Sequence, residues 1–271
     1  MRSSTQFTST AKLLKHTFSA ACLGAGLLMA QVASATTVQF QTVLGDFEVN
    51  LFDKTTPKTV ENFLAYVKAN AYVNTIIHRS VSGFVVQGGG FKYTGELPLA
   101  SITQNAKVVN EPVYSNLRGT IAMAKLGSDA NSATNQWFFN LSNSNASNLD
   151  KQNGGFTVFG QVTGNGMAIV DAIAALNRFN MGSPFDSIPL RNYTATDNTN
   201  KVPVTGDHFM LIENIVILNA DPDTAASLNP TKNTLINEKE KDDGGSGSMG
   251  LISLLMLGLL ALGRKSLLNR K

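Results

Sequence analysis

Short runs of alternating apolar and polar residues fill the middle of the chain, and they constrain its fold more than any other feature. Residues 37–43 and 47–51 alternate on either side of a Leu-Gly-Asp turn, which predicts a β-hairpin. Helical spacing of apolar residues occurs only at 57–67 and 166–176. Further short strands are predicted at residues 75–78, 85–87, 120–124, 137–140, 157–161 and 210–218. Many strands with only two helices favour a barrel or a sandwich over alternating β and α units.

The predicted strands lie in residues 36–220, which hold 12 basic and 13 acidic side chains. The formal charge of +3 therefore comes from the two ends of the chain. A nearly neutral segment has no excess of cations with which to bind a phosphate backbone. We expect residues 36–220 to form one domain that has no nucleic-acid partner.

Residues 1–35 have the features of a secretory signal peptide. Lys12 and Lys15 precede an apolar stretch at 18–30, and Val-Ala-Ser-Ala at 32–35 forms a small-x-small cleavage pattern. The alternative is a transmembrane anchor, but the stretch is too short for a hydrocarbon core of about 30 Å. We expect signal peptidase to cut after Ala35. The only cysteine, Cys22, would leave with this peptide, so no disulfide, thiol nucleophile or thiolate metal site is expected in the exported domain.

The other end of the chain predicts a polar linker at 221–243 and a membrane-directed tail at 244–271. The tail consists of Gly-Gly-Ser-Gly-Ser, a short apolar helix at 249–263 and a basic end, which favours the cytoplasmic side. This order resembles the GlyGly-CTERM sorting signal, which implies processing by a rhomboid-type protease. The alternative is a plain inner-membrane anchor. Either way, the domain is expected in the periplasm, at the cell surface or secreted after processing, with membrane contact only through this tail.

Residues 76–91 contain the densest motif of the chain, His-Arg-x-x-x-Gly-Phe-x-x-Gln-Gly-Gly-x-Phe. Its glycines lack the spacing of a phosphate-binding loop and suggest a tight bend or bulge instead. Arg-Gly-Thr-Ile-Ala-Met-Ala follows at 118–124, Gln-Trp-Phe-Phe-Asn at 136–140, and Phe-Thr-Val-Phe-Gly at 156–160. In this order, the motifs resemble the signature of cyclophilin-type peptidyl-prolyl cis-trans isomerases, over about residues 37–219.

The resemblance implies a mainly β fold, a closed eight-stranded antiparallel barrel flanked by two α-helices. It implies cis-trans isomerisation of X-Pro bonds in unfolded or exported polypeptides, without a metal or cofactor. Three residues match the catalytic set of the family: Arg79, Gln87 and Phe138. Four match the apolar wall that receives the proline ring: Phe84, Val85, Leu149 and Phe156.

The implied chemistry needs no nucleophile, because no covalent bond breaks. Twisting an X-Pro bond sacrifices amide resonance at a barrier of about 20 kcal/mol. A guanidinium at position 79 would hydrogen-bond the prolyl nitrogen, whose lone pair becomes available only when resonance is lost. A second hypothesis stays open at this point: a proline-binding or chaperone module that has little turnover and is displayed at the cell surface.

Overall fold

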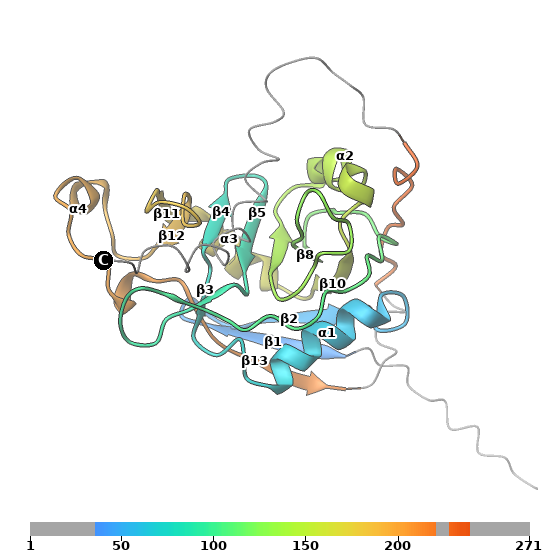
Figure 1. The fold of residues 1–271 in the computed structure, drawn as a ribbon, viewed down its shortest axis with the longest axis horizontal. Helices are drawn as coiled ribbons and strands as arrows, with labels where there is room; N and C mark the ends of the chain where they lie inside the picture. Colours follow the sequence, from blue (N-terminus) through green and yellow to red (C-terminus); the bar gives the residue numbers. More distant parts are fainter. Residues whose placement is uncertain (1–35, 221–227, 239–271) are drawn as a thin grey trace, which may run out of the picture. The chain divides into compact units, whose positions relative to one another are not determined.

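The computed structural model describes residues 36–220 and 228–238, and one antiparallel sheet dominates them (Figure 1). Its strands are β1 (Thr37–Thr42), β2 (Phe47–Leu51), β3 (Thr75–Ile76), β4 (Arg79–Val81), β5 (Val85–Gly88), β6 (Phe91–Lys92), β7 (Ala100–Ser101), β8 (Thr120–Met123), β9 (Trp137–Asn140), β10 (Val158–Val162) and β13 (Leu211–Asn219). A separate pair consists of β11 (Asn177–Phe179) and β12 (Ile188–Leu190). The α-helices are α1 (Pro57–Lys68), α2 (Ala146–Leu149), α3 (Gly166–Ala175) and α4 (Ala195–Thr199), and 3-10 turns occupy Asn143–Asn145, Gln152–Gly154 and Gly206–His208.

The main sheet closes on itself because one segment takes part in both of its ends. The strand order is β4-β5-β9-β8-β10-β2-β1-β13-β3-β6-β7. Only Ile77 and His78 separate β3 from β4, and their N–H groups donate to the carbonyls of Met210 and Gln87. Residues 75–81 are therefore hydrogen-bonded to β13 on one side and to β5 on the other. With this segment counted once, and with β6 and β7 extending the sheet beyond it, the described residues form a closed barrel of eight antiparallel strands, which confirms the expected fold.

Alternation along the strands separates two apolar clusters. Val86, Ile121 and Phe139 pair across β5, β8 and β9 and belong to the larger cluster, which draws on strands all around the barrel and fills its interior. Phe40 and Trp137 pack edge-on within it, with ring centroids 5.2 Å apart. Because neighbouring strand residues point to opposite faces, the residues between them form a second cluster outside the barrel. That outer cluster contains Phe52, Val85, Ala122, Ala124, Phe138, Leu149, Phe156 and Val158.

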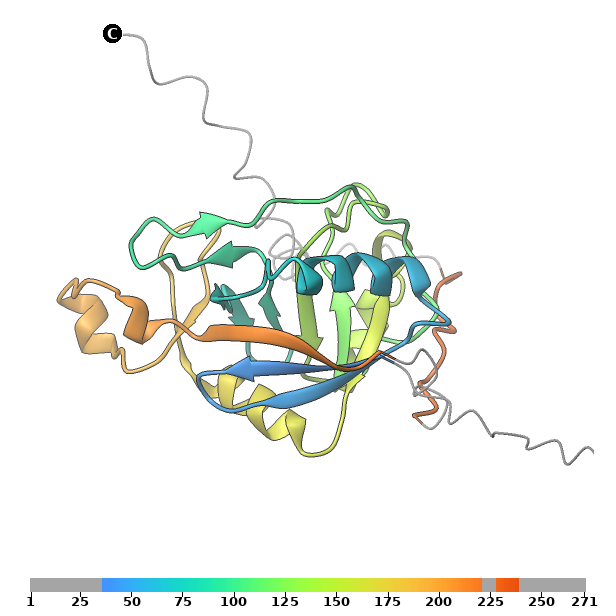
Figure 2. The ribbon, with the colours of Figure 1, turned by 90° about the horizontal axis from the view of Figure 1, so that it is seen from below.

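The two longer helices lie where the helical spacing predicted them. Pro57 begins α1, where its fixed φ suits the first turn, and Val60 and Phe63 are buried in the interior cluster. Val170 and Ile173 of α3 are buried in the same cluster. Figure 2 shows α1 and α3 on opposite sides of β1, β2 and β13.

The polar segment at 221–243 was predicted to be a linker, but its residues 228–238 pack against the domain and are called the strap below. Ser115 donates its N–H to the Thr231 carbonyl at 2.9 Å, and Asn233 donates its N–H to the Val113 carbonyl at 2.9 Å. Leu228 packs against the outer apolar cluster. The sequence did not predict this packing, because the apolar residues of the strap are too widely spaced to form a pattern, and because the pairing backbone at 113–115 is remote in sequence.

The remaining predictions about the ends lie outside the described residues: the signal peptide at 1–35, the linker residues 221–227 and 239–243, and the tail at 244–271. Within residues 36–220 and 228–238, none of the helices has the length and apolar character needed to cross a membrane.

Candidate active site

Three strands bring Arg79, Gln87 and Phe138 into one row on the outer face of the barrel. Arg79 lies opposite Gln87 in the β4–β5 pair, and Gln87 lies opposite Phe138 in the β5–β9 pair. Directly opposed residues of an antiparallel pair have Cβ atoms about 5 Å apart on the same face. The register alone therefore groups the three residues that the family motif assigns to catalysis.

A chain of side-chain hydrogen bonds fixes this row. Arg79 Nη1 donates to Gln87 Oε1 at 3.1 Å, and Gln87 Nε2 donates to Gln136 Oε1 at 2.9 Å. A primary amide offers two donors and two acceptor lone pairs. Gln87 thus holds the guanidinium in place and keeps one N–H and one lone pair for a peptide backbone.

The Arg79 guanidinium is buried with unused donors. The residue is 5% exposed, and its Nε and Nη2 atoms have no hydrogen-bond partner among the described residues. Burial lowers the pKa of Arg79 to about 10, and the charge of Asp186 opposes this shift. Burial also lowers the pKa of neighbouring His78 to about 3, with a smaller contribution from the Arg79 charge. At neutral pH Arg79 is therefore a cation and His78 is neutral, and the guanidinium keeps donors available to a ligand.

The residues expected to form the proline wall come together in the outer apolar cluster. Val85, Phe138, Leu149 and Phe156 belong to it, and Phe84 packs against it. The rings of Phe138 and Phe156 meet edge to face with centroids 5.7 Å apart. The first four side chains are at most 2% exposed, whereas Phe84 is only partly buried. Phe84 is therefore the member of the wall that is most open to solvent.

Asp150 anchors the segment that carries two of these wall residues. Its carboxylate is 1% exposed and accepts hydrogen bonds from Ser115 Oγ at 2.5 Å, from Asn116 N at 2.7 Å and from Asn116 Nδ2 at 2.9 Å. Asn233 of the strap donates its Nδ2 to the Asp150 carbonyl at 2.8 Å. Phe156 N–H donates to the carbonyl of Leu149, the residue before Asp150, at 2.8 Å. The strap and residues 115–116 therefore fix the position of this part of the wall.

Lys125 is a site residue that motif reasoning missed. Its Nζ donates to the Asn153 and Gly155 carbonyls at 2.7 and 2.6 Å and lies 4.9 Å from the centroid of the Phe156 ring. Burial lowers the pKa of Lys125 to about 8, and the charge of Asp129 opposes the shift. No local signal marks this lysine, because its partners lie almost thirty residues later in the chain.

Replacing Lys125 with methionine is expected to change how stability depends on pH. The unfolded chain holds the Lys125 proton up to the ordinary pKa of 10.5, whereas the folded chain loses it near 8. Between these values the unfolded state binds more protons, so the contribution of Lys125 to stability rises with pH. In urea unfolding at about pH 7.5 and about pH 9.5, the wild type should gain stability relative to Lys125→Met at the higher pH. The exposed Lys58→Met control should behave like the wild type, and equal pH dependence in wild type and Lys125→Met contradicts the prediction.

Residues 36–220 and 228–238 contain no group of three or more His, Cys, Asp or Glu side chains that could hold a metal ion. What the row offers is a desolvated cation, a polar anchor and an apolar surface. Such a site can bind and distort an amide without forming a bond to it.

Comparison with known proteins agrees with this geometry. The family model described as cyclophilin type peptidyl-prolyl cis-trans isomerase/CLD matches residues 37–195. A peptidyl-prolyl cis-trans isomerase of Acinetobacter baylyi is 36% identical over 184 residues, covering 67% of this chain and 88% of the relative. Peptidyl-prolyl cis-trans isomerase B of Escherichia coli is 38% identical over 146 residues, covering 50% of this chain and 82% of the relative.

Among solved structures, a cyclophilin type isomerase of Cryptosporidium parvum aligns with a TM-score of 0.47 and 23% identity. The alignment covers 68% of this chain and 98% of that one. The family match spans more than half of the chain and includes Arg79, Gln87, Phe138 and every residue of the proline wall. The chain belongs to the cyclophilin-type peptidyl-prolyl cis-trans isomerases.

Proposed function

We propose that this isomerase acts on X-Pro bonds of exported polypeptides and thereby assists their folding outside the cytoplasm. The row of Arg79, Gln87 and Phe138 supports the catalytic part of this proposal. An X-Pro bond isomerises in tens of seconds without a catalyst, which is slow enough to limit folding. A site that binds the twisted amide more tightly than either planar form lowers the barrier.

Each side chain has a distinct task in this mechanism. An unpartnered N–H group of Arg79 donates to the prolyl nitrogen as resonance is lost, and its desolvated surroundings strengthen that bond. Gln87 holds the guanidinium and binds the peptide backbone with its remaining groups. Phe138, with Val85, Leu149 and Phe156, holds the proline ring, so that rotation occurs within a fixed frame.

A proline-binding module with little turnover, displayed at the cell surface, is the second candidate, because an apolar wall can hold a proline ring whether or not isomerisation follows. Exchange NMR on an Ala-Pro peptide, with the wild type and Arg79→Ala, separates the two. A rate that depends on Arg79 supports the enzyme. Binding with equal, negligible rates in both proteins supports the module.

Export is supported by the residue that would follow the signal-peptide cleavage site. Thr36 donates its backbone N–H to Asp53 Oδ2 at 3.0 Å and its hydroxyl to Asp53 Oδ1 at 2.8 Å. Cleavage after Ala35 would turn this amide into an α-ammonium group next to a carboxylate. The hydrogen bond would become charge-assisted, which favours the cleaved form.

We expect mass spectrometry of the mature protein to find its N-terminus at Thr36 and its C-terminus within residues 244–248. The first result follows from signal-peptidase cleavage, and the second from a rhomboid-type sorting protease. Deleting only Gly244 and Gly245 should leave the tail uncut and the protein in the inner membrane. An intact C-terminus at Lys271 in the wild type supports simple anchoring and contradicts sorting.

A further inference from the structure

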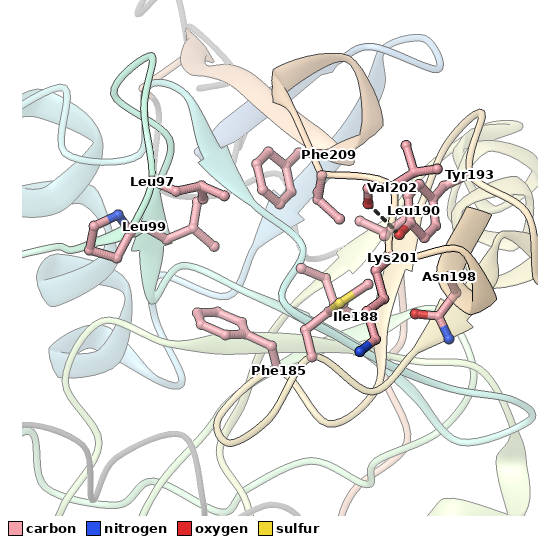
Figure 3. A pocket seen from close by; sticks show the side chains of 13 residues that line it. Leu97, Leu99, Phe185, Ile188, Leu190, Tyr193, Asn198, Lys201, Val202 and Phe209 are labelled. Carbon is pink, nitrogen blue, oxygen red and sulfur yellow. Dashed lines mark hydrogen bonds between the residues drawn. The ribbon is translucent and has the colours of Figure 1, made fainter.

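A cavity lies beside the barrel, and none of the residues that line it is Arg79, Gln87, Phe138 or a member of the proline wall. It has a volume of about 610 Å³ and lies between residues 97–99 and residues 181–209 (Figure 3). Its floor consists of the buried side chains of Ile188, Leu190 and Phe209. This volume falls within the range of cavities that bind small ligands or side chains.

The rim of the cavity is apolar and exposed. Leu97, Met181 and Val202 line it and are 52%, 37% and 39% exposed. They are half of the six large apolar residues that are exposed in the described part of the chain. Contiguous exposed apolar surface around a cavity marks a binding surface more often than scattered residues do.

One wall of the cavity is a feature of this chain that the family match does not include. That match ends at residue 195, whereas the wall includes Asn198, Lys201, Val202 and Phe209. Tyr193 holds the wall in place by donating its hydroxyl to the Val202 carbonyl at 2.7 Å (Figure 3). The isomerase chemistry derived above uses none of these residues.

The cavity is joined to the strand that carries Arg79. Ser80 donates its N–H to the Ser187 carbonyl at 2.8 Å, and Ser187 returns its hydroxyl to the Ser80 carbonyl at 2.5 Å. Phe185, which lines the cavity, meets the Phe91 ring at a centroid distance of 4.8 Å, and Phe91 packs on His78 at 5.1 Å. The residues at the cavity are therefore linked directly to the strand that carries Arg79, and a polypeptide long enough to reach both places would make its second contact intramolecularly.

The charge at the cavity specifies its occupant further. Lys201 is the one charged residue among those that line it, and its side chain forms no ion pair with the described residues. An apolar side chain would fill the floor, and an acidic neighbour would pair with Lys201.

We propose that this cavity binds an apolar side chain, next to an acidic residue, of the same polypeptide whose X-Pro bond lies at Arg79. The inference rests on the proposed function, and it makes the enzyme selective for longer clients with such a segment. Burying one leucine-sized side chain corresponds to about a ten-fold gain in affinity or more.

The test uses the full chain and two probes. One is a short Ala-Pro peptide. The other is a longer peptide that carries a Leu-Leu-Asp segment on each side of Ala-Pro, with a Gly-Ser spacer between each segment and Ala-Pro. The wild type is expected to bind the longer peptide about ten-fold more tightly than a version with serine in place of leucine. Val202→Asp should abolish this preference, and Lys201→Glu should weaken binding only when aspartate is present.

Leu218→Asp is the matched control. Leu218 is 50% exposed and lies near the far end of β13, about 20 Å along the strand from the end next to Phe209. This variant should keep the preference, and all variants should turn over the short peptide at the wild-type rate, which also shows that they fold.

Three outcomes overturn the inference: an undiminished preference in Val202→Asp, self-association that Val202→Asp abolishes, or a preference that appears only after residues 239–271 are deleted. The last two would identify a second copy or the chain's own end as the occupant. Failure of the isomerase proposal is distinct, because it appears as absent turnover of the short peptide while binding of the longer one is still measured.

Discussion

Arg79→Ala is expected to lower kcat/KM for an Ala-Pro peptide by about ten- to a hundred-fold. A hydrogen bond from a charged donor contributes about 1.5–3 kcal/mol, and each 1.4 kcal/mol corresponds to a factor of ten in rate. The bond to the prolyl nitrogen forms only when the amide is twisted, so the loss should fall mainly on kcat. Exchange NMR at saturating peptide measures kcat, and titration measures binding separately.

Arg79→Ala should lose activity without a comparable loss of stability. The Arg79 guanidinium is buried with only one hydrogen bond to the described residues, from Nη1 to Gln87. Removing the guanidinium relieves the cost of burying an incompletely paired charge, and this gain offsets the loss of the hydrogen bond to Gln87. Thermal unfolding of Arg79→Ala should therefore lie close to that of the wild type. The assigned role is contradicted if Arg79→Ala keeps the wild-type kcat, or if its loss of activity is explained by unfolding of the variant.

Arg79→Lys is the informative companion. Lysine keeps the charge but lacks the planar fork that reaches Gln87 and the amide together. We expect it to recover only a minor part of the lost rate. Full recovery would mean that charge alone, without directed donors, accounts for catalysis.

The local pattern predicted a β-rich domain with two helices, either a barrel or a sandwich, and the resemblance to a family added the closed barrel and the row of Arg79, Gln87 and Phe138. The sequence located the barrel strands to within a residue or two, except β4 (Arg79–Val81), which the predicted strand at 75–78 did not reach. A period of two places Arg79, Gln87 and Phe138 on a shared face once β4, β5 and β9 pair. The pairing itself is not local. The strand pairing could be predicted only because the motifs resemble those of a known family.

The remaining features depend on contacts between distant residues, which no periodic pattern encodes. Lys125 is buried because carbonyls at 153 and 155 meet its ammonium group. The strap is ordered because its backbone pairs with 113–115. The cavity beside β12 exists because two irregular segments meet over Phe209. Each depends on surfaces that fit together, and the alternation of apolar and polar residues does not predict such a fit.

Asp150→Ala is expected to cost about 3 kcal/mol of unfolding free energy, the largest stability effect that we predict for a single polar residue. The carboxylate accepts three hydrogen bonds from Ser115 and Asn116 in a buried setting. Alanine leaves Ser115 Oγ and Asn116 N without their acceptor, while Asn116 Nδ2 still donates to the Phe156 carbonyl at 3.1 Å, and each unsatisfied buried group costs about 1–3 kcal/mol. Urea unfolding should therefore show a lower midpoint with an unchanged slope.

Asp150→Ala should also lower activity, because it weakens peptide binding rather than the chemical step. Leu149 and Phe156 are joined by a backbone hydrogen bond next to Asp150, so loosening this segment widens the proline wall. KM should rise several-fold while kcat stays near the wild-type value, because Arg79 and Gln87 lie on other strands. A fall in kcat with an unchanged KM would argue against a positioning role.

Two controls isolate the buried network. Asp150→Asn keeps one acceptor oxygen for Asn116, so it should lose less stability than alanine. Asp171→Ala removes an exposed carboxylate that pairs with Arg118 at 2.6 Å, and exposed ion pairs contribute only about 0–1 kcal/mol. If Asp150→Ala and Asp171→Ala destabilise the protein equally, burial of the Asp150 network does not govern its contribution, and the anchoring of the proline wall must be assigned to the strap instead.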